Sequence, residues 1–219
     1  MMPKEKVYLT LCVTFSVVVV SGNLIYQKFI ELPFFALHTF ELSVGVLLYP
    51  LTFLLTDLIT EFYGKEKANF CVKLGIAMSI FFIAIISLMD SLNATHWSPV
   101  DNLTFHRVFG FYSIAFVASI LACYLAQSID IALYAGIRRL TGPKWLWLRN
   151  NGSTAVSLLI DTTVVISFMT LFGAVPKTHM TTLIWNSYVY KLCFTVLSTP
   201  IFYLGVYGLR QWVYRSPYE

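Results

Sequence analysis

Charged side chains are scarce in this chain of 219 residues. Asp, Glu, Lys and Arg make up 12% of the sequence and apolar residues make up 58%, whereas a soluble domain has about 25% charged residues. So few charges cannot cover a surface that faces water, and the composition therefore predicts an integral membrane protein. The length suits a single transmembrane domain, residues 1–219, and leaves no room for a soluble catalytic domain.

Motifs of metal sites, disulfides and common enzymes are absent from the sequence. Four cysteines lie in or beside apolar runs, without CxxC spacing or a neighbouring histidine, which favours packed, reduced thiols. They are Cys12, Cys71, Cys123 and Cys193. No HExxH, GxSxG or P-loop pattern occurs. We therefore expect no metal, no cofactor and no enzymatic activity.

Six apolar runs are long enough to cross a bilayer as helices, which requires about 20 residues. They are Val7–Gln27, Phe40–Ile59, Ala68–Met89, Phe109–Ile137, Ser153–Val175 and Leu183–Leu209. They lack the alternation of apolar and polar residues that marks the strands of a membrane β-barrel. The sequence predicts an all-α polytopic membrane protein, a six-helix transmembrane bundle whose first helix is retained and not removed as a signal peptide.

The basic residues predict the orientation, because they gather in cytoplasmic loops. With a cytoplasmic N-terminus, eleven of the fifteen Lys and Arg residues lie at cytoplasmic ends, and Lys191 lies inside the last run. The three at external ends are Lys28, Arg107 and Lys177. We expect both termini to be cytoplasmic. The net charge of +4 is spread over short loops, which indicates contact with membrane lipid and not with nucleic acid.

Carboxylates inside the apolar runs are the most informative residues. At the centre of a membrane helix a charged side chain costs about 2.5–3.5 kcal/mol, so such residues are functional by default. Asp57 and Glu61 are four residues apart and share a helix face, where two close carboxylates disfavour double ionisation. The alternative for Glu61 is a solvated interface position with Lys65 as its partner.

Two further aspartates, Asp130 and Asp161, lie inside the fourth and fifth runs without a basic residue on their own helix face. With Asp57 they are predicted to lie in the cytoplasmic half, where the three could line one cavity. The alternative for Asp130 and Asp161 is a structural salt bridge to a basic residue on another helix. The candidates for that residue are Arg149, Arg138 and Lys191.

Amides supplement these acids. Asn23 and Gln27 are expected to face the external half, where Glu41 would start the second helix, and Gln127 shares a helix face with Asp130. An acid-lined lower half and an amide-lined upper half would make the cavity polar throughout, as a translocation path requires. Hydrogen bonding between helices is the alternative for Asn23 and Gln27.

The start of the fifth helix carries three more polar residues. Ser153 or Asn150 can cap that helix. Arg149 is unusual so close to the start of a helix, because the positive end of the helix dipole disfavours a cation there. Pairing with one of the aspartates would explain it.

The six runs divide into three plus three, and an odd number of spans inverts the second half in the membrane. The second run then corresponds to the fifth, and each carries an aspartate, Asp57 and Asp161. Inverted repeats with midplane sites recur in secondary transporters, so the fold is compatible with an inverted 3+3 repeat.

Three blocks of sequence resemble the queuosine precursor transporter family. The first is TDLITEFYGK, residues 56–65, and the second runs from Ala118 to Asp130 and includes QSID at 127–130. The third is WLRN at 147–150, followed by Ser153, Thr154 and Asp161. The blocks occur in the family's order, and the resemblance covers nearly the whole chain.

The resemblance implies import of a 7-deazaguanine base across the bacterial inner membrane for tRNA modification. The base would be 7-cyano-7-deazaguanine, 7-aminomethyl-7-deazaguanine or queuine. The positions implied to bind substrate or couple transport are Asp57, Glu61, Gln127, Asp130, Arg149, Asn150, Ser153 and Asp161, with Asn23 and Lys28 in a looser register.

The chemistry of such a base agrees with these residues. Its N1–H and exocyclic amine lie side by side and suit a carboxylate, and its carbonyl requires a donor such as Asn, Gln or Arg. Its flat rings favour an aromatic platform. We expect a secondary transporter that works by alternating access, with the aspartates binding the base or relaying a proton.

Coupling to H⁺ or Na⁺ and assembly into an oligomer are both compatible with this interpretation. Two alternatives remain open at this point. The chain could be the substrate-binding subunit of an energy-coupling-factor vitamin importer, which needs an ATPase module. It could also be a membrane enzyme that acts on a lipid or a peptide.

Overall fold

The computed structural model describes residues 3–26, 28–34, 38–110, 112–142, 144–173 and 175–214, and most of them lie in helices. The long helices are α1 (Pro3–Ile25), α2 (Tyr49–Asp90), α4 (Tyr112–Thr141), α5 (Leu146–Leu171) and α6 (Met180–Tyr214). Over the described residues, five helical segments are long and apolar enough to cross a membrane. The chain is therefore a multi-pass membrane protein, as its composition predicts.

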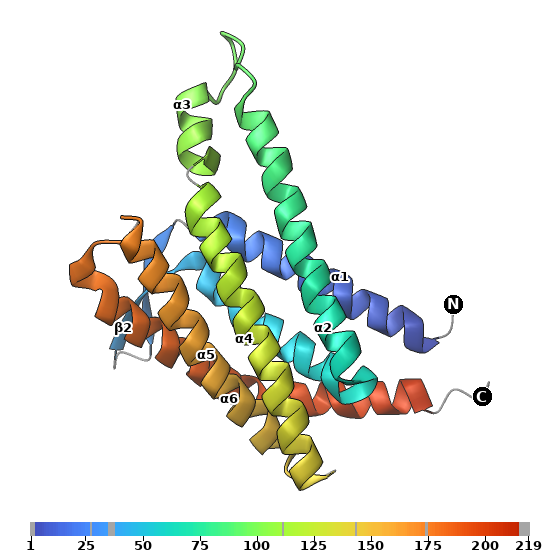
Figure 1. Cartoon of the computed structure of the whole chain (residues 1–219). Helices are drawn as coiled ribbons and strands as arrows, with labels where there is room; N and C mark the ends of the chain where they lie inside the picture. The colour runs from blue at the N-terminus through green and yellow to red at the C-terminus, as the bar shows by residue number, and fades with distance from the viewer. Residues whose placement is uncertain are drawn as a thin grey trace.

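Short elements connect these helices. They are the strands β1 (Phe29–Phe34) and β2 (His38–Ser43), the 3₁₀ helices η1 (Val44–Leu48) and η3 (Lys177–His179), the helix α3 (Asn102–Phe105) and the π-helical turn η2 (His106–Gly110). Figure 1 shows that both ends of the chain lie on the same side of the molecule and that β2 lies on the other. We call these the terminal side and the hairpin side.

The strands β1 and β2 correct the prediction that the second helix starts at Phe40. They pair antiparallel from Phe29 opposite Ser43 to Phe34 opposite His38. Phe40 and Leu42 are buried, whereas Glu41 between them is exposed, and this period of two belongs to a strand. Glu41 therefore lies in a hairpin and does not start a helix, and α2 begins nine residues later than predicted.

A single glycine divides α2 into two helical segments, 49–63 and 65–90. Gly64 has φ 83° and ψ 171°, a conformation that is essentially restricted to glycine. The chain changes direction there (Figure 1). Tyr63 on one side of the break donates a hydrogen bond of 2.8 Å to the carbonyl of Lys4, which ties the break to the start of α1. The predicted runs Phe40–Ile59 and Ala68–Met89 fall largely on the two segments.

The fifth helix also begins earlier than predicted, at Leu146 and not at Ser153. Trp145 precedes it with a left-handed backbone (φ 61°) and no side-chain cap, so the expectation that Ser153 or Asn150 caps this helix is wrong. Leu146 is buried against Leu58 and Tyr134, and this apolar contact holds the additional helical turns in place. As a result Asp161 lies beyond the middle of α5.

Glycine also allows a close approach near the hairpin. A Cβ atom on Gly45 in η1 would overlap the carbonyl oxygen of Gly22 in α1 and would lie 3.1 Å from Tyr26. The Ser43 hydroxyl donates a hydrogen bond to the Tyr26 carbonyl and accepts one of 3.2 Å from the Gly45 amide. The base of the hairpin is thereby packed directly against the end of α1.

We predict that Gly64→Ala destabilises the protein by about 1–3 kcal/mol, because alanine at this φ and ψ is strained. No atom lies within 4 Å of the added Cβ, so the effect reports backbone strain alone. Thermal unfolding in detergent, followed by intrinsic fluorescence, measures it. The control is Gly136→Ala at an exposed helical position near the end of α4, which should be neutral or stabilising by about 0.5–1 kcal/mol. Equal melting temperatures for the two variants would contradict the role of Gly64.

Candidate functional site

A cavity of about 80 Å³ lies on the hairpin side, between the end of α1, the start of α2 and the facing parts of α4, α5 and α6. This volume is several times what one water molecule requires. Most of its lining is apolar, and its polar side chains include Asn23, Thr52, Ser119, Asp161, Ser187 and Lys191. In composition, a largely apolar lining with a few placed polar groups is typical of a small-molecule site.

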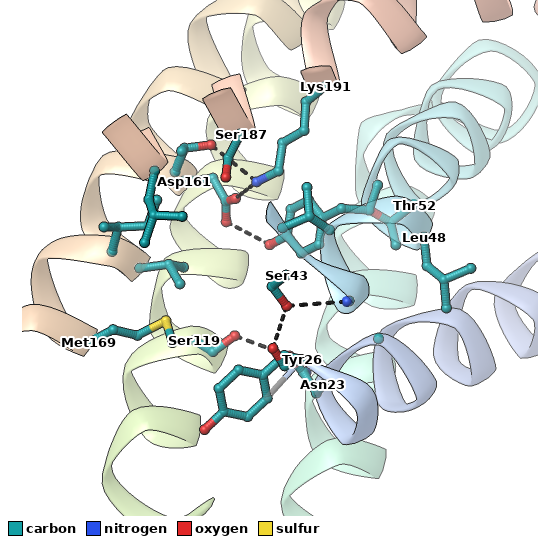
Figure 2. A pocket seen from close by; sticks show the side chains of 18 of the residues that line it. Asn23, Tyr26, Ser43, Leu48, Thr52, Ser119, Asp161, Met169, Ser187 and Lys191 are labelled. Atoms are coloured by element: carbon teal, nitrogen blue, oxygen red, sulfur yellow. Dashed lines mark hydrogen bonds and ion pairs between the residues drawn. The ribbon is translucent and has the colours of Figure 1, made fainter. Parts of the chain in front are cut away.

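A buried ion pair forms one wall of this cavity (Figure 2). Lys191 Nζ lies 2.8 Å from Asp161 Oδ2 and donates a further hydrogen bond of 3.1 Å to Thr162. Tyr49 donates its hydroxyl proton to Asp161 Oδ1 at 2.6 Å, and Lys191 Nζ lies 4.4 Å from the centroid of the same tyrosine ring. The structural salt bridge to Lys191 is therefore present, and Asp161 is not an unpaired acid.

A hydrogen bond between helices forms the opposite wall. Ser119 of α4 donates to the Asn23 amide oxygen of α1 at 3.1 Å, and Figure 2 shows these residues grouped with Tyr26, across from Asp161 and Lys191. Lys28, in contrast, is exposed and does not line the cavity. Gln27 lies outside the described residues.

A chain of buried polar contacts leads from the cavity toward the terminal side. Thr52 lines the cavity and accepts a hydrogen bond of 3.0 Å from the Gln127 amide nitrogen. The Gln127 amide oxygen accepts one of 2.9 Å from Thr56. Gln127 lies one helical turn before Asp130, and Thr56 directly precedes Asp57, so this contact joins the cavity to the next acidic pair.

That pair consists of Asp57 on α2 and Asp130 on α4, which lie between the contact of Thr56 with Gln127 and the contact of Glu61 with Tyr134. Both side chains are buried. The Ser157 hydroxyl donates a long hydrogen bond of 3.4 Å to Asp130 Oδ1. Both oxygens of Asp57, Asp130 Oδ2 and the Thr154 hydroxyl have no hydrogen-bond partner among the described residues. Ser153 also lies beside Asp130, although its hydroxyl donates to the Arg149 carbonyl at 2.7 Å.

Glu61 lies closest to the terminal side and is buried, which excludes the interpretation that it is a solvated partner of Lys65. Arg149 Nη2 lies 2.8 Å from each of its carboxylate oxygens. Tyr134 donates to Glu61 at 3.0 Å and accepts from Arg149 Nε at 3.3 Å. Arg149 is therefore paired with this glutamate and not with an aspartate.

Two further arginines surround Glu61 where it meets the surface. Arg138 donates to the backbone carbonyls of Thr60 and Glu61 at 3.1 and 2.9 Å, and Arg210 lies 3.5 Å from Glu61 Oε1. A surface pocket of about 340 Å³ lies here, lined by Glu61, Phe62, Arg138 and Arg210. The Glu61 cluster thus separates an opening on the terminal side from the interior.

The predicted site residues therefore divide into three groups along the molecule, which are the cavity, the Asp57–Asp130 pair and the Glu61 cluster. Asp161 and Asn23 line the cavity, whereas Asp57 and Asp130 lie outside it. The expectation that all three aspartates share one half differs from the structure because α5 starts seven residues earlier than predicted, which moves Asp161 toward the hairpin side. Asn150 is buried near the start of α5 but lies outside the cavity.

Sequence reasoning named Lys191 only as an alternative partner and missed Tyr49, Thr52 and Ser119. Lys191 was marked by its position inside an apolar run, where a charge is costly. The other three carried no signal, because serine and threonine hydroxyls usually bond to the backbone of their own helix, and Tyr49 is one of 13 tyrosines.

The fold and this buried polar core define a multi-pass helical membrane protein with an internal small-molecule cavity. A family model described as "Putative vitamin uptake transporter" matches residues 43–205, and the chain belongs to that family. Curated relatives are named as transporters, and the chain is accordingly a transporter and not an enzyme.

Three relatives cover most of the chain. A "Probable queuosine precursor transporter" of Bacillus subtilis (strain 168) is 30% identical over 188 residues, which is 84% of this chain and 78% of the relative. A relative in Haemophilus influenzae with the same description is 26% identical, over 78% of this chain and 69% of the relative. A "Queuosine precursor transporter" of Escherichia coli (strain K12) is 25% identical, over 88% of this chain and 80% of the relative. No solved structure matches.

We predict that Arg149→Met destabilises the protein by about 3–5 kcal/mol, because it leaves the Glu61 carboxylate buried without its counter-charge. Adding Glu61→Gln to this variant should recover part of the loss, since the uncompensated charge is then removed. Thermal unfolding of both variants measures the coupling. The control is Arg139→Met at an exposed position of α4, where little change is expected. Additive losses in the double variant would contradict the pairing.

Proposed function

We propose that this chain imports a 7-deazaguanine precursor of queuosine across the bacterial cytoplasmic membrane for tRNA modification. The base is 7-cyano-7-deazaguanine, 7-aminomethyl-7-deazaguanine or queuine. The proposal is supported by the family to which the chain belongs and by three relatives that are named as queuosine precursor transporters. The observation that carries it is the buried Asp161–Lys191 pair in the wall of an otherwise largely apolar cavity.

The cavity offers the groups that a deazaguanine needs. A carboxylate such as Asp161 accepts the N1–H and the exocyclic amine, while Lys191 or the Asn23 amide donates to the ring carbonyl. Tyr26 and Tyr49 line the same cavity and supply aromatic faces for the flat rings. Tyr49 and Lys191 already donate hydrogen bonds to the two Asp161 oxygens. When the base binds, its donors replace these hydrogen bonds, so the Asp161 carboxylate is not left without a partner.

Transport by alternating access requires a barrier on each side of the cavity. The Glu61–Arg149 salt bridge, with Tyr134 as a third member, forms the barrier toward the terminal side in our proposal. Opening it would join the cavity region to the surface pocket at Arg138 and Arg210. Thr52 and Gln127 lie between the cavity and this surface pocket, and their side chains provide hydrogen-bonding groups for a substrate that passes from one to the other.

We further propose that residues 1–219 form a single transmembrane domain with six spans and both termini in the cytoplasm. The segments of α2 on either side of Gly64 are then separate spans. This topology places eleven of the fifteen basic residues at cytoplasmic ends and the hairpin outside. The positions of Asp57 in the second span and Asp161 in the fifth support an inverted 3+3 repeat.

A C-terminal fluorescent protein fusion tests this orientation. We expect it to fluoresce in bacteria and a C-terminal alkaline phosphatase fusion to remain inactive, because the last span then ends in the cytoplasm. Fusions placed after Trp97, in the long connection between α2 and α3, should give the opposite pair of results. Active phosphatase at the C-terminus would contradict the proposed topology.

Purified protein in liposomes tests the transport function. We expect labelled 7-cyano-7-deazaguanine, 7-aminomethyl-7-deazaguanine or queuine to enter the vesicles without any further protein. A substrate-binding subunit of an energy-coupling-factor importer would bind the base but would require its ATPase module for uptake. Binding without transport would therefore favour that alternative, and the absence of both would contradict a precursor carrier.

In the same vesicles we predict that Asp161→Asn weakens binding of the base about tenfold or more, because a charge-assisted hydrogen bond contributes about 1.5–3 kcal/mol. The double variant Asp161→Asn/Lys191→Met avoids leaving the lysine unpaired, so it should keep its fold and still bind weakly. The control is Asp101→Asn in the exposed N-cap of α3. Undiminished binding by folded Asp161→Asn protein would remove Asp161 from the site.

A further inference from the structure

Two of the four buried carboxyl groups lack a counter-charge. Glu61 is paired with Arg149, and Asp161 is paired with Lys191. The remaining two, Asp57 and Asp130, are 1% and 0% exposed. They lie between two contacts of α2 with α4, Thr56 to Gln127 and Glu61 to Tyr134, and no salt bridge reaches either of them among the described residues. Neither group belongs to the cavity lining, so they form a separate site.

An ionised carboxylate can only accept hydrogen bonds. The only hydrogen bond to this pair among the described residues comes from the Ser157 hydroxyl, at 3.4 Å from Asp130. Both Asp57 oxygens and Asp130 Oδ2 have no hydrogen-bond partner. Two neighbouring carboxyl groups in a buried position strongly disfavour double ionisation. A proton on either carboxyl group removes one charge and supplies the missing donor.

We propose that Asp57 and Asp130 together bind one proton that is carried with the substrate. This inference rests on the proposed function and assigns the coupling ion to a site separate from the base. Ser157 of α5 closes the site from the third helix, and Thr154 lies one helical turn before it.

The groups around the pair connect it to the barrier on the terminal side. Asp57 lies one helical turn before Glu61 on α2, and Glu61 is bonded to Arg149 of α5. Tyr134 on α4 contacts both members of that salt bridge. While the Glu61–Arg149 salt bridge is closed, the arginine charge is neutralised and the proton stays on the pair.

Opening that salt bridge changes the balance. Arg149 is then free to stabilise ionised Asp57, and the proton can leave toward the terminal side, which is the cytoplasmic side in the proposed topology. On the other side, the contacts from Thr52 through Gln127 join the pair to the substrate cavity. Protonation of the Asp57–Asp130 pair is thereby linked to opening of the Glu61–Arg149 salt bridge. Coupled import requires such a link.

The test uses full-length protein in liposomes and labelled 7-cyano-7-deazaguanine, with the other two precursors tried in parallel. Uptake is compared under a pH gradient that is acidic outside, under a sodium gradient and under neither. With one proton per base, one pH unit supports up to about tenfold accumulation. For Asp57→Asn and Asp130→Asn, the ratio of uptake with the pH gradient to uptake without it should fall to about one.

The matched control is Glu66→Gln, which changes an exposed carboxylate two residues beyond Gly64 and should keep the response to the pH gradient. Uptake that follows the sodium gradient, or that ignores both gradients, would overturn the proton site while leaving the transport function intact. A pH response that persists in both aspartate variants would overturn the residue assignment.

A second measurement does not depend on transport. Infrared spectroscopy of the purified protein at neutral pH should show the carbonyl band of a protonated carboxylic acid, and Asp57→Asn or Asp130→Asn should abolish it. The Glu66→Gln protein should keep it. Wild-type protein without this band would overturn the proposal. If the band is present but none of the three bases is transported, the proposed function fails and the protonated pair stands.

Discussion

The need to match every buried charge inside the protein governs this structure. Within a membrane there is no water to solvate a carboxylate, and an uncompensated one is costly. Glu61 and Asp161 meet this need with Arg149 and Lys191 at 2.8 Å. Asp57 and Asp130 meet it only by sharing a proton in our proposal. The arrangement of the helices follows from these partnerships as much as from apolar packing.

Each partnership joins two different helices, so the charges also determine which helices are adjacent. Glu61 ties α2 to α5, and Asp161 ties α5 to α6. Helix α5 takes part in both salt bridges and also lines the cavity. Buried ion pairs add little net stability compared with apolar contacts, which makes them suitable as contacts that open and close during a transport cycle.

Backbone geometry allows these side chains to meet. The break at Gly64 sends the chain back along the molecule immediately after Glu61, and the approach of Gly45 to Gly22 brings the hairpin base to the end of α1. Both features depend on the absence of a side chain. The glycines were visible in the sequence, but the strained φ at one and the close contact at the other could be recognised only from the fold.

The sequence by itself determined the membrane class, the positions of most helices and the family resemblance, because scarce charge and long apolar runs leave no other class. It also singled out the four acids, which the structure buries. It did not determine the partners of those acids. That Glu61 pairs with Arg149, that Asp161 lies with Lys191 in a cavity apart from Asp57, and that residues 38–43 form a strand were decided by tertiary structure. The reason is that charge pairing acts between helices, whose rotation and starting points depend on contacts distant in the chain.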